Sequence, residues 1–319
     1  MITQPMDVLT HYEVRKTKKQ KTAFITAVSA YAASLRYTCT VEKGSLGSRN
    51  IILGDPTKAK YLITAHYDTC AWMPFPNFIT PTNFLVYLLF QLLLTAVIFA
   101  VAIGGGVVLG LGVGTFTQNS ELGAVTAGVL AWLLLVGCLL LMMCGPANRH
   151  TANDNTSGVV TVLEIAASMP ENLRDRVCFV LFDLEEMGLI GSASYRRAHK
   201  TQTNSQTVLN LDCVGDGDHI LFFPSKKVKV DKTMMARLRL VNGRMKTKSL
   251  LIHEKGMAFY PSDQASFPYG VGIAAFRKAK LLGLYCSRIH THRDTILEQT
   301  NVNILRAALT SLIGADTAD

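Results

Sequence analysis

The sequence predicts an α/β protein in which a domain built on a mixed, mostly parallel sheet is interrupted by a transmembrane helical hairpin. Two observations lead to this prediction. Outside residues 69–148, short apolar runs alternate with helical patterns along the 319-residue chain, as is typical of α/β domains. Inside that interval Glu121 is the sole charged side chain, and such a lack of charge is typical of membrane segments.

The elements of the α/β part follow from local patterns. Residues 6–36 are predicted to form a helix, because Phe24, Val28 and Tyr31 lie at one-face spacing. Short apolar runs predict strands, and longer one-sided patterns predict helices. The predicted strands are "YTCTVE", "NIILG", "KYLITAH", "RVCFVLF" and "QTVLNLD", and the later helices are "SGVVTVLEIAASM" and "NILRAALTSLI".

Residues 84–103 and 122–144 are the two predicted membrane spans. Each is close to the ~20 apolar residues that a helix needs to cross a bilayer. The Gly-rich stretch between them predicts a short linker, so the helices should be antiparallel and both ends of the hairpin should emerge on one side. The alternative is a pair of buried core helices in a soluble protein. We therefore predict an insert at 77–146 and a discontinuous domain formed by 1–76 and 147–319.

Charge predicts the location of this domain. Basic residues such as Arg149 lie outside the hairpin and are absent from its linker, so the positive-inside rule places the domain in the cytoplasm, at the cell membrane. The net charge of +9 agrees with contact with anionic lipid, and we expect no nucleic-acid partner. Residues 1–14 lack the apolar core of a secretory signal, and seven cysteines without CxxC spacing indicate a reducing compartment.

Chemically active side chains occur at five places in the chain. Each place follows an apolar run or, for Asp154, comes just before a predicted helix. Any one of them alone is more often a solvated or capping group. In α/β sheets, however, the carboxyl ends of the strands form the functional crevice, so together they predict one site. They are His66 and Asp68; Asp154; Glu185 and Glu186; Asp212; and His290, His292 and Asp294.

Two histidines and three carboxylates are the ligand types of zinc or a similar divalent ion. A carboxylate beyond a four-ligand set suggests two ions that share one bridging ligand. Asp212 follows an apolar run, and an ion would stabilise its charge. Asp68 and Asp294 lie a few residues after His66 and His290 in the sequence, and are suited to orient the imidazoles of these histidines.

Six motifs in order resemble one family: "AHYDT", "ANDNTSGVVTVLEIA", "LFDLEEMGLIGSASY", "NLDCVG", "SDQASF" and "HTHRDT". The family is the co-catalytic zinc aminopeptidases, which include bacterial leucyl aminopeptidases, plasma glutamate carboxypeptidase and, more distantly, glutaminyl cyclase. The resemblance covers residues 50–70 and 149–300. The chain departs from the family in its hairpin and in Gln264, where His is common.

The resemblance implies a three-layer zinc-aminopeptidase-like domain with two divalent metal ions, zinc by analogy with the family. It implies that Glu185 is the general base, which takes a proton from the attacking water and delivers it to the leaving amine. The implied ligands are Asp154 as the bridge, His66 and Asp212 at one ion, and Glu186 and His290 at the other. His292 is a rival to His290, and Tyr260 is a candidate oxyanion donor.

We therefore predict a membrane-anchored aminopeptidase that hydrolyses N-terminal residues from peptides. One hypothesis is that the hairpin presents a membrane-associated peptide to the site, with residues 69–82 at the entrance; the other is that it is only an anchor. Two further functions stay open. The chain could be an acyl-transfer enzyme of the glutaminyl-cyclase type, or a non-catalytic membrane scaffold on a peptidase fold.

Overall fold

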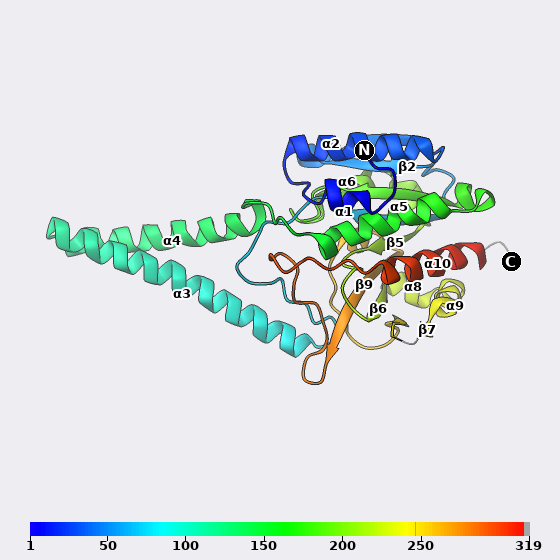
Figure 1. The fold of residues 1–319 in the computed structure, drawn as a ribbon. Helices are drawn as coiled ribbons and strands as arrows, with labels where there is room; N and C mark the ends of the chain where they lie inside the picture. Colours follow the sequence, from blue (N-terminus) through cyan, green and yellow to red (C-terminus); the bar gives the residue numbers. More distant parts are fainter. Residues whose placement is uncertain (246, 316–319) are drawn as a thin grey trace.

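The computed structural model describes residues 1–245 and 247–315, and its centre is a ten-stranded sheet (Figure 1). The strands lie in the order β1-β2-β4-β3-β5-β9-β6-β8-β7, and β10 pairs with β9. Their bounds are β1 Cys39–Lys43, β2 Arg49–Leu53, β3 Tyr61–His66, β4 Val177–Phe182, β5 Thr207–Leu211, β6 His219–Pro224, β7 Gly243–Arg244, β8 Ser249–Ile252, β9 Gly270–Ala279 and β10 Gly283–Tyr285.

The sheet is mixed, and its parallel part lies at the centre. Strands β4, β3, β5 and β9 are neighbours in parallel pairs, whereas β1–β2, β2–β4 and β6–β9 are antiparallel. The predicted α/β fold with a mixed sheet is confirmed. The parallel centre brings the carboxyl ends of β3, β4 and β5 to one edge.

Helices cover both faces of the sheet, which makes three layers. Along β4, Val177, Phe179 and Leu181 join the larger hydrophobic cluster with helices α2, α5, α9 and α10, while Cys178 and Val180 point into a smaller cluster beside α6. This alternation is the strand period of two. The helices are α1 Asp7–His11, α2 Lys18–Ser34, α3 Phe84–Thr117, α4 Ser120–Cys144, α5 Gly158–Ser168, α6 Ile190–Ala198, α7 Lys200–Thr203, α8 Lys226–Val230, α9 Lys232–Val241 and α10 Gln299–Ala315, with short turns η1 Ser45–Gly47, η2 Ala152–Ser157, η3 Glu171–Arg176 and η4 Asp263–Ser266.

The predicted single helix over residues 6–36 is wrong, because the chain breaks between α1 and α2. Thr17 caps α2: its side chain accepts a hydrogen bond from the Gln20 N–H, and the Gln20 side chain accepts one from the Thr17 N–H. This capping box fixes the start of a helix. Residues 12–16 form a connecting strap without helix or strand, and Arg15 within it is fully buried.

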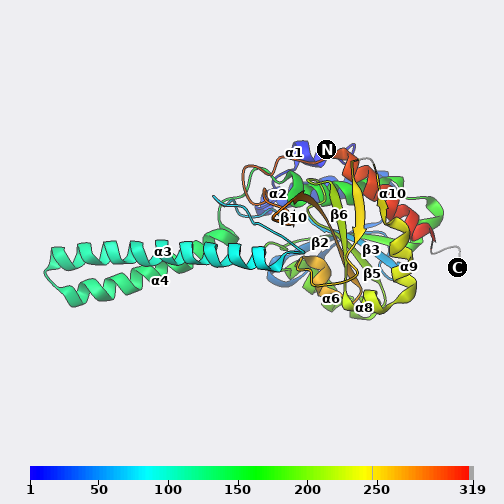
Figure 2. The same cartoon turned by 90° about the horizontal axis from the view of Figure 1, so that it is seen from below.

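Helices α3 and α4 project together from the body as a long hairpin, seen from two directions in Figures 1 and 2. Both are long and apolar enough to cross a membrane, judged by length and composition. Only 11% of the most apolar window of α3, and none of that of α4, is buried in the protein. Neither helix therefore lies in the protein core.

The predicted Gly-rich linker at 104–121 is wrong, because α3 continues to Thr117 and Gln118 and Asn119 alone form the turn. Gly106 and Gly110 face α4 so closely that a Cβ on either would lie 2.5–2.6 Å from atoms of Ala127. Small residues let helices approach in this way, particularly in membranes. The glycines form the interface between the two helices, and this packing outweighs their low helix propensity.

Candidate metal centre

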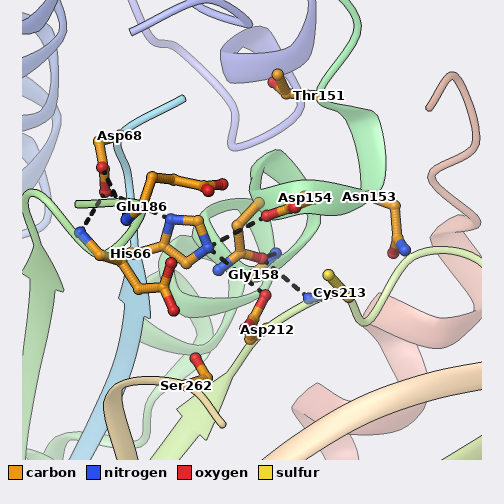
Figure 3. A network of polar contacts seen from close by, with 12 residues as sticks. His66, Asp68, Thr151, Asn153, Asp154, Gly158, Glu186, Asp212, Cys213 and Ser262 are labelled. Atoms are coloured by element: carbon orange, nitrogen blue, oxygen red, sulfur yellow. Dashed lines mark hydrogen bonds and ion pairs between the residues drawn. The ribbon is translucent and has the colours of Figure 1, made fainter. Parts of the chain in front are cut away.

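The predicted site residues converge at the edge where β3, β4 and β5 end, and Figure 3 shows His66, Asp154, Glu186 and Asp212 close together there. His66 is the last residue of β3, Asp212 follows β5, and Glu185 and Glu186 follow β4. Asp154 lies in the η2 turn, just before α5. A sixth side chain, His290, enters from the loop between β10 and α10.

Asp154 lies between the two histidines and presents one carboxylate oxygen to each. Its Oδ1 is 3.3 Å from His66 Nε2, and its Oδ2 is 3.1 Å from His290 Nε2. Asp212 Oδ1 lies 3.5 Å from His66 Nε2, and Glu186 Oε2 lies 3.4 Å from His290 Nε2. Two donor clusters therefore share one carboxylate.

The site crowds carboxylates in a buried space. Burial, followed by repulsion from neighbouring carboxylates, raises the pKa of Glu186 well above its usual value. Burial likewise raises the pKa of Glu185, although His66 acts to lower it. For Asp154, burial acts to raise the pKa, but contacts with His290 and His66 outweigh it and the pKa is lowered. Bound cations would balance this excess of negative charge.

Atoms without partners support a fit to divalent ions. Among the described residues, Asp212 Oδ1 and Glu186 Oε1 are shielded from solvent and have no hydrogen-bond partner. Buried polar atoms are seldom left in this state. Three groups of side chains place their ligand atoms within 4.8 Å of one another, and all three lie in this site: His66, Asp154 and Asp212; His66, Glu185 and Glu186; and Cys70, Asp154, Glu186 and His290.

Asp68 lies beside His66 and holds the loop of the two glutamates. Its Oδ1 lies 3.5 Å from His66 Nδ1 and accepts the Glu185 N–H at 3.0 Å, while Oδ2 accepts the Glu186 N–H at 3.3 Å. Such carboxylates orient ligating imidazoles. Among the described residues His66 Nδ1 forms no hydrogen bond, so the orienting role of Asp68 stays a prediction; the two N–H contacts give Asp68 another role, the positioning of Glu185 and Glu186.

The predicted role of Asp294 is wrong. Instead of orienting the His290 imidazole, its carboxylate accepts the backbone N–H groups of Asn153 at 2.7 Å and of Asp154 at 3.0 Å. Among the described residues, His290 Nδ1 has no hydrogen-bond partner. The turn at 291–294 aims the Asp294 carboxylate at η2, so this residue holds the backbone of Asp154.

Two weaker candidates, His292 and Tyr260, are not placed for the roles predicted for them. His292 is exposed and lines a separate cavity of about 300 Å³ with Trp72 and His150, so it does not compete with His290 for the cluster. The Tyr260 hydroxyl donates a hydrogen bond to the backbone oxygen of Asp212 at 3.0 Å. Because that hydroxyl proton is already engaged, the structure does not support Tyr260 as an oxyanion donor.

Arg15 was not predicted as a site residue; in the sequence it counted only among the basic residues outside the hairpin, inside a predicted helix. Its guanidinium is fully buried and donates from Nε to the Tyr67 carbonyl at 2.5 Å and from Nη1 to Thr156 Oγ1 at 3.1 Å. It thus joins the loop after His66 to the turn that carries Asp154. No local sequence pattern predicts these contacts, because they form only when residues 12–16 meet the segments of Tyr67 and Thr156 in the folded protein.

Cys70 was also missed, although it directly follows "AHYDT". Its buried thiol lies in the cluster of Asp154, Glu186 and His290, and burial raises its pKa well above the usual value. The sequence offered one signal: a soft ligand type two residues after Asp68. Without the fold, nothing distinguished it from the other six cysteines.

Comparison with known proteins identifies relatives. The model of peptidase family M28 matches residues 140–312. Aminopeptidase YwaD of Bacillus subtilis (strain 168) is 29% identical over 136 residues, which cover 37% of this chain and 29% of that protein. The match therefore spans less than a third of the length of this relative.

Solved structures share the fold at low sequence identity. Porphyromonas gingivalis glutaminyl cyclase aligns with a TM-score of 0.62 and 15% identity, over 98% of this chain and 97% of that one. The LapA aminopeptidase of Legionella pneumophila aligns with a TM-score of 0.56 and 14% identity, over 97% and 69%. The resemblance read from the six motifs is confirmed, and the chain belongs to peptidase family M28.

Proposed function

We propose that the chain is a membrane-anchored, metal-dependent aminopeptidase that hydrolyses N-terminal residues from peptides. The single observation that carries the proposal is the placement of Asp154, whose two carboxylate oxygens face two different histidines at 3.3 and 3.1 Å. A shared carboxylate between two donor clusters is the arrangement that a pair of divalent ions requires. Membership of a peptidase family and the match to a Bacillus aminopeptidase support the reaction class.

Two ions fit the donors, and zinc suits their nitrogen and oxygen ligands. We assign Asp154 as the bridge, His66 and Asp212 to one ion, and Glu186 and His290 to the other. When bound, such ions supply Lewis-acid polarisation of a carbonyl and acidify water. Asp68 and Asp294 hold the surrounding backbone in place.

Glu185 is assigned as the general base. Its carboxylate lies within 4.8 Å of ligand atoms of His66 and Glu186, and its backbone is fixed by Asp68. Unlike Asp154, Glu185 is only half-buried, so water can reach it. It would take a proton from the attacking water and pass it to the leaving amine.

The hairpin is assigned as the membrane anchor, with the domain of residues 1–76 and 147–319 in the cytoplasm and the insert at 77–146. The chain leaves the body beside the site: Ala71 pairs with Ala147, and the Met73 N–H donates to the His290 carbonyl at 2.8 Å. Trp72 is 45% exposed there, which suits an interfacial position. We infer that the mouth of the site lies near the membrane surface and receives membrane-associated peptides.

Replacement of the hairpin tests this inference. Residues 84–144 would be exchanged for a short soluble linker, leaving 71–83 in place because Ile79 pairs with Cys286. The variant should hydrolyse a small soluble amino-acid amide at a rate within a few-fold of the full chain, whereas hydrolysis of a lipid-associated peptide should fall by about tenfold or more, as expected from lost effective concentration. If both rates change equally in a folded, metal-loaded variant, the hairpin is only an anchor.

A second candidate is ring closure of N-terminal Gln, as in glutaminyl cyclases. The observation that favours it is the alignment of a glutaminyl cyclase over nearly the whole chain. Incubation of the detergent-purified protein with a mixed peptide library, read by mass spectrometry, separates the two. Loss of single N-terminal residues supports the aminopeptidase; cyclised N-terminal Gln with intact chains supports the alternative. Unchanged peptides would point to a non-catalytic scaffold.

A further inference from the structure

The cluster around His290 contains a donor that the proposed function does not use. The Cys70 sulfur and ligand atoms of Asp154, Glu186 and His290 all lie within 4.8 Å of one another. Cys70 is 0% exposed, and the Glu186 side chain is nine-tenths buried with its Oε1 lacking a partner. Building on the proposed function, we propose that the Cys70 sulfur is a fourth protein ligand of the ion held by Asp154, Glu186 and His290.

The backbone holds Cys70 in this position from both sides. Its carbonyl accepts the Asn148 N–H at 3.1 Å, and the next residue, Ala71, pairs with Ala147. The preceding residue, Thr69, accepts the Arg15 N–H on its hydroxyl at 2.8 Å. The sulfur is therefore placed by the fold at the point where the chain departs for the hairpin.

The environment of Cys70 differs from that of two other buried cysteines, Cys178 and Cys286. The Cys178 thiol lies in an apolar cluster, 3.9 Å from the Phe179 carbonyl, and Cys286 Sγ lies 3.9 Å from Asn153 Nδ2. Among the described residues, no hydrogen bond is formed by the Cys70 sulfur, which instead faces carboxylate and imidazole donors. Packing alone accounts for Cys178; it does not account for a thiol set among metal-ligand side chains.

A fourth ligand makes the two sites unequal. One sulfur, two carboxylates and one imidazole complete the four-ligand shell usual for zinc, and such closed sites hold their ion. The other cluster, His66, Asp154 and Asp212, has three protein ligands and so keeps a position free for substrate. The thiol proton is released to solvent as the sulfur–metal bond forms. A thiolate also favours zinc and cobalt over magnesium and manganese.

X-ray absorption of the zinc-loaded full-length protein in detergent tests the bond directly and needs no variant. With one zinc per chain, we expect a sulfur neighbour at about 2.3 Å beside nitrogen and oxygen neighbours at about 2.0–2.1 Å. A spectrum that requires nitrogen and oxygen alone, at one and at two zinc ions per chain, would overturn the proposal.

Cobalt titration of two matched variants identifies the sulfur. Wild type and Cys178→Ala should develop a near-ultraviolet thiolate-to-cobalt charge-transfer band with the first equivalent of Co²⁺, and Cys70→Ala should not. In Cys70→Ala, the affinity for the more tightly bound ion should fall more than about tenfold. Even the loss of a residue that only hydrogen-bonds to a metal ligand lowers metal affinity by about 10–100-fold. A band that persists in Cys70→Ala refutes the assignment.

Failure of this proposal is distinguishable from failure of the proposed function. If two ions bind and peptides are shortened, but no sulfur neighbour is seen, Cys70 is not a ligand and the aminopeptidase assignment stands. If the protein binds no divalent ion, both are wrong.

Discussion

Glu185→Gln is expected to lower peptide turnover by about 100-fold or more while leaving the metal content unchanged. The amide keeps the size of the side chain but cannot accept the proton of the attacking water. The Glu185 backbone should stay in place, because Asp68 accepts its N–H whatever the side chain. The measurement is kcat on a peptide substrate together with elemental analysis of the same sample.

The neighbouring glutamate provides the contrast. Glu186 Oε2 lies 3.4 Å from His290 Nε2, within the second donor cluster, so Glu186→Gln should lose metal as well as activity. The two adjacent substitutions therefore separate a base from a ligand. Near wild-type turnover in Glu185→Gln, at unchanged metal content, would rule out Glu185 as the base.

Asp154→Asn should reduce both the number of bound ions and the rate. The substitution removes the charge shared by His66 and His290 and replaces one oxygen by an NH₂ group that cannot ligate a cation. We expect the affinity for at least one ion to fall by more than about 100-fold. Removal of a residue that only hydrogen-bonds to a metal ligand already lowers metal affinity by up to about 100-fold, and Asp154 is assigned as a ligand itself. Calorimetric titration of the metal-free variant with Zn²⁺ measures this.

A control variant for this experiment is Asp231→Asn. Asp231 caps α9 by accepting the Met234 N–H, and asparagine caps helices equally well, so metal binding should not change. Two ions bound by Asp154→Asn at wild-type affinity would refute the bridge.

Much of the site could be predicted because its residues lie in short segments that follow strands. His66 and Asp212 directly follow apolar runs, and the parallel centre of the sheet brings such ends together. Cys70 and Arg15 could not be predicted in this way. Arg15 follows no strand and meets Thr156 across 141 residues, and Cys70, although it lies shortly after β3, could not be told from the other cysteines without the fold.

The sequence was less informative where a local pattern had two physical meanings. Glycines at 106 and 110 indicated a linker, but in an apolar helix they permit close packing against Ala127. Likewise, the apolar spacing over 6–36 did not reveal the capping box at Thr17 that begins a separate helix. Strands β6, β8 and β9 were not predicted from the sequence, and they complete the half of the sheet beyond β5.

The most direct test of the proposed two-ion site is a titration of the metal-free, detergent-solubilised full-length protein with Zn²⁺, measuring bound zinc and release of the N-terminal residue from a peptide in the same samples. We predict no hydrolysis without zinc, and activity that rises until two ions are bound per chain. Full activity in the metal-free protein would contradict a metal-dependent reaction. Full activity with only one zinc ion bound per chain at saturation would contradict the two-ion site.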